Sequence, residues 1–259
     1  MILSTDPSAN ALAETVMSLR LPEESIAQRV AEIQRDLLAQ SRHLQAGNFS
    51  AIHVADLEFL FNAYDSRFLG GLLRPALAGR SLTFHLSPRM TRAGGKTTRL
   101  RTRSGEVRFE IAVASSMLFD AFAHADRRVS VAGLECDTRL DALQRVLEHE
   151  IVHLIEQLCW GSSNCAAHRF QDIAARVFRH RAHTHSLVTR RERASVAGIV
   201  VGSRVTFMFE NRQLTGRVNR ITKRATVLVE DPNGIQYSDG SRYSRYYVPI
   251  QWLKPLPPG

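Results

Sequence analysis

The chain has 259 residues, and its 34 Lys and Arg against 25 Asp and Glu give a formal net charge of +9. This length allows one enzyme-sized core plus one small module, and the basic balance favours an anionic partner such as nucleic acid. Three cysteines without a CxxC pair exclude a four-cysteine zinc ribbon and fit a reducing compartment. No apolar stretch is long enough to span a bilayer and residues 1–7 lack a signal-peptide pattern, so we expect a cytoplasmic protein without membrane contact.

Residues 1–50 are interpreted as an N-terminal helical segment. Apolar residues from Ile26 to Leu37 recur at spacings of three and four, and acidic residues follow Pro22 at the expected helix start. We expect this helix to pack on the following domain. A helix that binds a partner or a second copy is the alternative.

Residues 51–188 are predicted to form a domain that begins with a helix and continues with short strands. A strand is expected at residues 81–86, and a hairpin at 97–103 and 107–113 turns at Ser104-Gly105. Seven basic residues and one acid lie between positions 89 and 108. Such concentrated charge suits a phosphate backbone, and the predicted nucleic-acid contacts here are Arg99, Arg101 and Arg103.

The pentad His149-Glu150-Ile151-Val152-His153 is the most informative motif of the chain. Two imidazoles one helical turn apart can hold one Zn²⁺, and the glutamate between them can act as a general base. Leucines and an isoleucine from Leu140 to Leu158 predict a helix with one buried stripe, capped by Asp137 or Thr138. Both histidines lie roughly opposite that stripe, where they would face a cleft.

A catalytic zinc needs a third protein ligand and an open position for water. A second helix is expected from the apolar spacing of residues 170–178, and His168 at its start is the first candidate for that ligand. The predicted site is therefore zinc held by His149, His153 and His168, with Glu150 as the catalytic base. The alternatives for the third ligand are Cys165, His180, His183 and His185.

After a basic linker at residues 189–197, the pattern changes from helical to short strands. Strands are expected at residues 203–209, 214–221, 225–230 and 246–248, with turns at 211–212, 223–224 and 232–234. Residues 198–259 therefore resemble a small SH3-like or KOW-like barrel. Arg242 and Arg245 alternate with tyrosines and are predicted to contact nucleic acid. A protein-docking module is the alternative for this region.

The region from Leu57 to about His185 resembles the SprT-like metalloprotease domain, which includes the DNA–protein crosslink protease Spartan. Besides the pentad, the resemblance rests on the helix and turn of residues 60–73, on residues 89–96, and on the strand of residues 109–114. The family usually places its third zinc histidine at the head of a His-Gly-x-x-Phe motif. Alignment on Phe170 would put that ligand at Ala166, whereas the spacing from His153 selects His168.

The resemblance implies an α+β protein, in which a zincin-like metalloprotease domain of helices and a small sheet precedes the all-β barrel. It implies a zinc-dependent endopeptidase that acts on DNA-associated or DNA-crosslinked proteins, with single-stranded or damaged DNA as a partner. The alternative is a nucleic-acid-associated adaptor in which zinc is structural and no peptide is cleaved. A structural site would be closed by four protein ligands.

Overall fold

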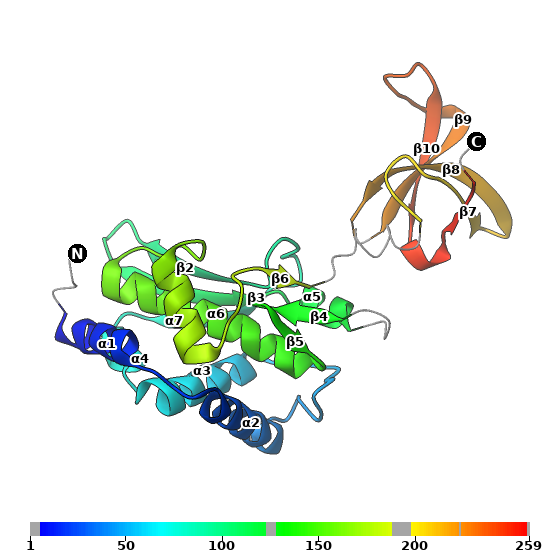
Figure 1. Ribbon diagram of the computed structural model, residues 1–259. Helices are drawn as coiled ribbons and strands as arrows, with labels where there is room; N and C mark the ends of the chain where they lie inside the picture. Colours follow the sequence, from blue (N-terminus) through cyan, green and yellow to red (C-terminus); the bar gives the residue numbers. More distant parts are fainter. Residues whose placement is uncertain (1–5, 123–127, 188–197, 223, 258–259) are drawn as a thin grey trace. The chain divides into compact units, whose positions relative to one another are not determined.

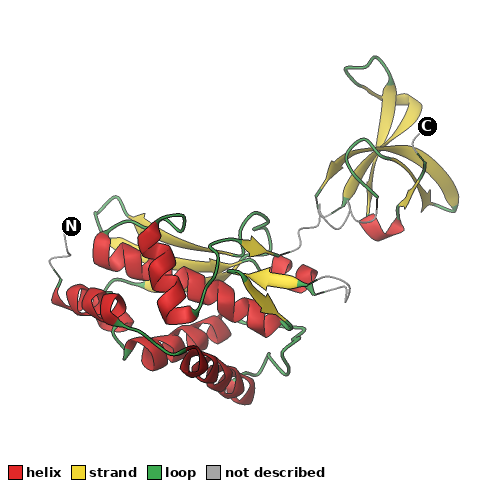
Figure 2. Ribbon diagram, viewed as in Figure 1, coloured by secondary structure: helices red, strands yellow, loops and turns green. Residues whose placement is uncertain are grey.

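The computed structural model describes residues 6–122, 128–187, 198–222 and 224–257, and the protein is an α+β protein with three small sheets (Figures 1 and 2). The chain divides into two compact units, residues 1–187 and 188–259. The predicted basic linker, residues 189–197, lies outside the described residues. Among the described helices, none is both long and apolar enough to cross a membrane.

Four helices open the first unit: α1 (Pro7–Ser18), α2 (Glu23–Gln40), α3 (Val54–Leu69) and α4 (Leu73–Ala76). The predicted helix is α2, and its apolar residues are buried in the same core as the rest of the unit, so the packing prediction is confirmed. The sequence reading missed α1, which begins with an Asp6 side-chain cap followed by a proline. Both signals are typical of a helix start.

A three-stranded sheet follows, made of β1 (Leu82–Leu86), β2 (Gly95–Arg101) and β3 (Val107–Val113) in the order β1-β3-β2. The predicted hairpin is β2 paired antiparallel with β3, and β1 adds parallel to β3. Strand β2 ends at Arg101, so Arg103 lies in the turn rather than on the strand. As an edge strand, β2 runs beside the long helix of the metal motif.

That helix, α6 (Arg139–Trp160), is the centre of the first unit. Thr138 and Asp141 form a capping box at its start, and Gly161 ends it in the left-handed conformation at φ 77°. The prediction of a single buried stripe was wrong. Helix α6 is buried on most of its surface, because helices α1, α3 and α7 and strands β2 and β3 all pack against it.

The chain returns to α6 through α7 (His168–Phe178) and a second small sheet. This sheet contains β4 (Val129–Val131), β5 (Leu134–Cys136) and β6 (His185–Ser186) in the order β5-β4-β6, after the short helix α5 (Ser115–Ala121). Residue His185 pairs with Val131 in this sheet. Strand β6 therefore fixes the position of His185, seven residues after the end of α7.

The second unit is a five-stranded antiparallel sheet in the order β10-β9-β8-β7-β11. Its elements are β7 (Arg204–Phe209), β8 (Arg212–Ile221), β9 (Ala225–Gln236), β10 (Arg242–Val248), the 3₁₀ helix η1 (Ile250–Trp252) and β11 (Lys254–Pro255). The four main predicted strands are confirmed, but the predicted turn at residues 232–234 is wrong. These residues lie within β9 as a bulge, and Gly234 allows the backbone of Tyr243 to approach closely.

The capping box of α6 gives a direct test of how this helix is stabilised. Thr138→Ala removes the hydroxyl that accepts from the Asp141 N–H at 3.2 Å and should lower the free energy of unfolding of the first unit by about 1 kcal/mol. Thr138→Ser keeps the hydroxyl and should stay close to wild type. Urea unfolding followed by helical circular dichroism measures both, and equal losses in the two variants would contradict the cap.

Candidate metal centre

Helix α6 brings His149 and His153 together, with ring centroids 4.9 Å apart. The loop after Gly161 then carries Cys165 to the same place, so one ligand atom from each of the three residues lies within 4.8 Å of the others. His149 is buried, whereas His153 and Cys165 are half-buried. Two imidazoles and a thiol fit zinc, which is bound by nitrogen and sulfur ligands. The chain therefore contains a possible metal-binding cluster.

The ring of His153 is oriented by a chain of hydrogen bonds from the α6–α7 loop. Ser163 Oγ donates its one hydrogen to Glu156 Oε2 at 2.6 Å, so it must accept from His153 Nδ1, which lies 2.7 Å away. The Nε2 atom of His153 is then unprotonated and available as a metal ligand. Arg169 anchors the other carboxylate oxygen, with Nε 2.6 Å from Glu156 Oε1.

His149 is kept neutral by its surroundings. Burial, helped by the neighbouring histidines, lowers the pKa of His149 to about 2. Its Nδ1 atom is buried and has no hydrogen-bond partner among the described residues. A neutral imidazole is the form that binds a metal. Burial likewise raises the pKa of the Cys165 thiol, so metal binding there releases a proton.

Glu150 lies on the β2 side of α6, and its carboxylate is held by one threonine. Thr97 Oγ1 lies 2.8 Å from Glu150 Oε2 and 2.9 Å from the Glu150 carbonyl oxygen. A Cβ atom at Gly95 would lie 2.6 Å from Glu150 Oε1, so the glycine leaves room for the carboxylate. Burial raises the pKa of Glu150 to about 7, although the Thr97 hydrogen bond lowers it in part. Such a group can exchange a proton near neutral pH.

A second buried carboxylate, Glu148, ties the return segment to α6. Tyr64 donates to Glu148 Oε1 at 2.7 Å, Arg145 contacts both oxygens at 2.8 and 2.9 Å, and His180 Nε2 lies 2.9 Å from Oε2. Burial alone would raise the pKa of Glu148, but Arg145 and His180 outweigh it and hold that pKa below its usual value. His180 is therefore engaged with a carboxylate rather than with the metal cluster.

The structure separates the candidates for the third ligand. His168 is exposed at the first residue of α7 and does not belong to the ligand group, which contains Cys165 instead. The ring of His185 lies 4.7 Å from that of His149, while His183 Nδ1 is 3.4 Å from Gln171 Nε2. The possible metal-binding cluster thus contains His149 and His153 of the predicted set together with Cys165, the first alternative, and does not include His168.

The nucleic-acid residues predicted from charge lie in two different units. Arg99, Arg101 and Arg103 are exposed on or just after β2, and Arg99 Nη1 donates to the Gly161 carbonyl at 3.3 Å. Arg242 and Arg245 are exposed on β10. Sequence reasoning missed the residues that position the metal cluster: Gly95, Thr97, Glu156, Ser163 and Arg169. Gly95 lies in the segment of residues 89–96 and Thr97 in the predicted strand of residues 97–103, but neither position was linked to Glu150.

Comparison of the chain with protein-family models, with curated proteins and with solved structures gives no match in any of the three searches.

The identity of the third ligand can be tested by zinc affinity. Cys165→Ala should weaken zinc binding by roughly 100-fold or more, since loss of an outer partner of a ligand alone costs about 10- to 100-fold. His168→Ala should bind zinc like wild type, because its exposed ring lies outside the ligand group. Competition with a chromogenic chelator measures both constants. The reverse ranking of the two variants would exclude the cysteine set.

The buried histidines also predict how the metal-free protein responds to acid. Burial, then the charges of neighbouring histidines, lowers the pKa of His185 from 6.5 to about 4. Between these pH values the unfolded chain holds a proton that the folded chain lacks, so the free energy of unfolding falls as pH falls. The decline due to this residue is at most about 1.4 kcal/mol per pH unit.

Urea unfolding at pH 7, 6 and 5 in the presence of a chelator measures this decline. His185→Gln should flatten it, whereas His43→Gln, at an exposed position, should leave it unchanged. If wild type and His185→Gln lost stability equally with acid, the enclosure of this ring would not be the cause.

Proposed function

We propose that the protein is a zinc-dependent endopeptidase of the SprT-like type, in which the first unit is a zincin-like domain and the second an SH3-like barrel. One observation carries the proposal: Glu150 shares a single helix with His149 and His153, and Thr97 holds its carboxylate at 2.8 Å. A buried, partnered glutamate between two neutral imidazoles is the arrangement that metal-assisted hydrolysis requires.

Zinc would be held by His149, His153 and Cys165. Three protein ligands are typical of catalytic zinc, and the ion would supply Lewis acidity for a peptide carbonyl and lower the pKa of water. A thiolate ligand donates more negative charge than an imidazole does, so this set makes a milder Lewis acid than three histidines. The hydrogen bond from His153 Nδ1 to Ser163 keeps the metal-binding nitrogen free.

Glu150 is the general base and then the general acid. Its carboxylate accepts a proton as water attacks the peptide carbonyl, and the same group delivers that proton to the leaving amine. A pKa of about 7 allows both transfers near neutral pH. Two residues of β2 fix the Glu150 side chain in position. Thr97 donates to Oε2, and Gly95 leaves space for Oε1.

Strand β2 provides the path for an extended substrate. It is at the edge of its sheet, and its residue Thr97 contacts the Glu150 carboxylate, while Gly95 leaves room for that group. A peptide that adds to an exposed strand edge takes its affinity from main-chain hydrogen bonds. A peptide lying along β2 would therefore pass the general base.

Proteins bound or crosslinked to DNA are the proposed substrates. The resemblance to the SprT-like family supports this class, and so does the charge of β2. Arg99 and Arg101 lie on the strand face shared with Thr97, since they alternate with it at steps of two. Cations next to the substrate path would attract a protein that is carried on DNA.

A nucleic-acid-associated adaptor with a structural zinc is the second candidate, and one observation favours it. The ring of His185 lies 4.7 Å from His149, close enough that a small shift of β6 could make it a fourth ligand. A site closed by four protein ligands has no position for water. In that case Glu150 would have no catalytic role.

Glu150→Gln separates the two candidates. For an endopeptidase, the amide cannot accept the proton, so cleavage of a DNA-bound model protein should fall by roughly 100-fold or more. Zinc content should stay near one per chain, because Glu150 is not in the ligand group. Glu135→Gln, at an exposed acid on β5, which belongs to a different sheet from β2, serves as the control. Wild type that binds zinc but cleaves nothing, with or without DNA, would favour the adaptor.

A further inference from the structure

Three arginines and a leucine form one row across the sheet of the second unit. Arg204 on β7 pairs with Arg217 on β8, Arg217 pairs with Leu228 on β9, and Leu228 pairs with Arg245 on β10. Directly paired residues of antiparallel strands project from the same face of a sheet. The three arginines therefore share one face, opposite the apolar core of this unit, which contains Val205, Phe207, Val218 and Val227.

A parallel row extends the same face. Arg220 pairs with Thr226, and Thr226 pairs with Tyr247, whose side chain is 62% exposed. Tyr243 and Tyr247 flank Arg245 along β10 at steps of two, so they also lie on this side. We call this surface the arginine face and define it by its cationic and aromatic members, Arg204, Arg217, Arg220, Tyr243, Arg245 and Tyr247.

The arginine face carries four arginines against two acids, Glu230 and Asp239, which line its pocket. Arg204, Arg217 and Arg220 are exposed, and within the described part of the chain their side chains make no hydrogen bond or ion pair. Arg245 is oriented instead, with its guanidinium 5.4 Å from the centroid of Tyr237 and Nε 2.6 Å from the Tyr237 hydroxyl. Like charges paired directly across strands destabilise a sheet, so this surface is complementary to a polyanion.

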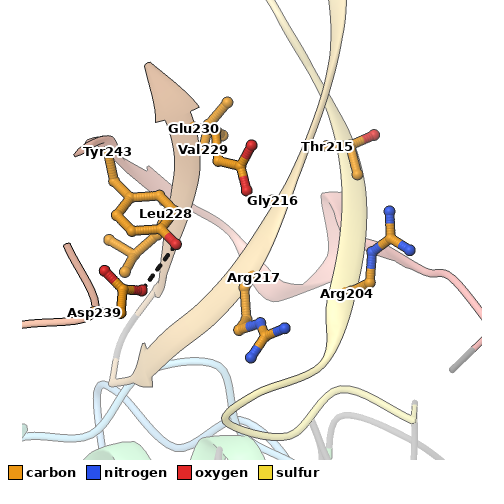
Figure 3. Close-up of a pocket in the computed structure, with 9 residues that line it drawn as sticks. All are labelled: Arg204, Thr215, Gly216, Arg217, Leu228, Val229, Glu230, Asp239 and Tyr243. Carbon is orange, nitrogen blue, oxygen red and sulfur yellow. Dashed lines mark hydrogen bonds between the residues drawn. The ribbon is translucent and has the colours of Figure 1, made fainter. Parts of the chain in front are cut away.

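The face is hollowed between its arginines and tyrosines. A pocket of about 460 Å³ is lined on one side by Arg204 and Arg217 and on the other by Tyr243 and Asp239, and Glu230 also lines it (Figure 3). The Tyr243 hydroxyl donates to Asp239 Oδ2 at 3.0 Å, which fixes the ring. Leu228 contributes apolar surface to the lining. A pocket of this size accepts a small planar group, with cations beside it for an attached phosphate.

We propose that the arginine face binds single-stranded nucleic acid, with phosphates on Arg204, Arg217 and Arg220 and one base in the pocket against Tyr243. Tyrosine rings and arginines on one groove bind single strands because every base offers a face for stacking. A duplex keeps its bases stacked and cannot place one in the pocket. An acidic peptide would use the arginines but leave the aromatic pocket empty.

This site rests on the proposed function only in its link to DNA-bound substrates, and the two can fail separately. Binding is therefore measured with the full chain carrying Glu150→Gln and without a protein substrate. The readout is the fluorescence anisotropy of a labelled single-stranded oligothymidine at several salt concentrations. If the oligonucleotide does not bind, the proposed binding site fails and the peptidase proposal stands. If the oligonucleotide binds but wild type cleaves nothing, the peptidase proposal fails and the binding site stands.

Two arginines of β8 give a matched pair of variants. Arg217→Gln lies on the arginine face and should weaken binding several-fold. Arg212→Gln removes the same charge from an exposed residue whose side chain projects from the other face of β8. It should change affinity by less than about twofold. Each phosphate contact contributes about 0.7 to the slope of log affinity against log salt for a single strand. The double variant Arg204→Gln/Arg217→Gln loses two such contacts, so its slope should be shallower by about 1.4.

The pocket has its own test. Tyr243→Phe keeps the ring and should bind like the parent, whereas Tyr243→Ser should lose roughly tenfold in affinity. Thermal unfolding of each variant checks the fold, and if Tyr243→Ser unfolds, the arginine pair decides alone. Equal losses for Arg217→Gln and Arg212→Gln would overturn the proposal. So would equally tight binding of a blunt duplex, or displacement of the oligonucleotide by polyglutamate as effectively as by unlabelled strand.

Discussion

The structure of the first unit depends on three buried glutamates that helix α6 carries into its core. Glu148, Glu150 and Glu156 are each at most 2% exposed, and a buried carboxylate is costly unless it is paired or hydrogen-bonded. Each therefore fixes a different segment against the helix: Glu148 fixes α3 and the chain after α7, Glu150 fixes β2, and Glu156 fixes the α6–α7 loop. The α6–α7 loop carries Cys165 of the possible metal-binding cluster, and the chain after α7 carries His185, whose ring lies 4.7 Å from that of His149.

The partners of these glutamates also divide their chemistry. Glu148 and Glu156 have arginine partners and serve to hold structure. Glu150 has only a threonine, and burial raises its pKa to about 7. The residues around each carboxylate thus set its pKa, so glutamates on one helix can have different roles. The proposed catalytic base is the one glutamate of the three that is left without a cation.

Helices α2, α6 and α7 and the β2–β3 hairpin could be predicted from periodicity because they have strong local patterns, whereas α1 and the sheet of β4, β5 and β6 were not predicted. The His149, Glu150 and His153 cluster followed from spacing on one helix. The third member of the possible metal-binding cluster could not be singled out in this way, because Cys165 reaches the two histidines through a loop whose course is set by Ser163, Glu156 and Arg169. The bulge in β9 was read as a turn, since Pro232 and Gly234 are typical of both. Cross-strand register, which defines the arginine face, cannot be obtained from the pattern of single strands.

The proposed zinc site on α6 and the loop after it has two imidazoles and one thiolate as ligands. X-ray absorption at the zinc edge of the purified, zinc-loaded protein reports these ligands. We expect one sulfur neighbour at about 2.3 Å and two imidazole nitrogens at about 2.0–2.1 Å, with a lighter atom completing the shell. A first shell of nitrogen and oxygen alone, without sulfur, would contradict it.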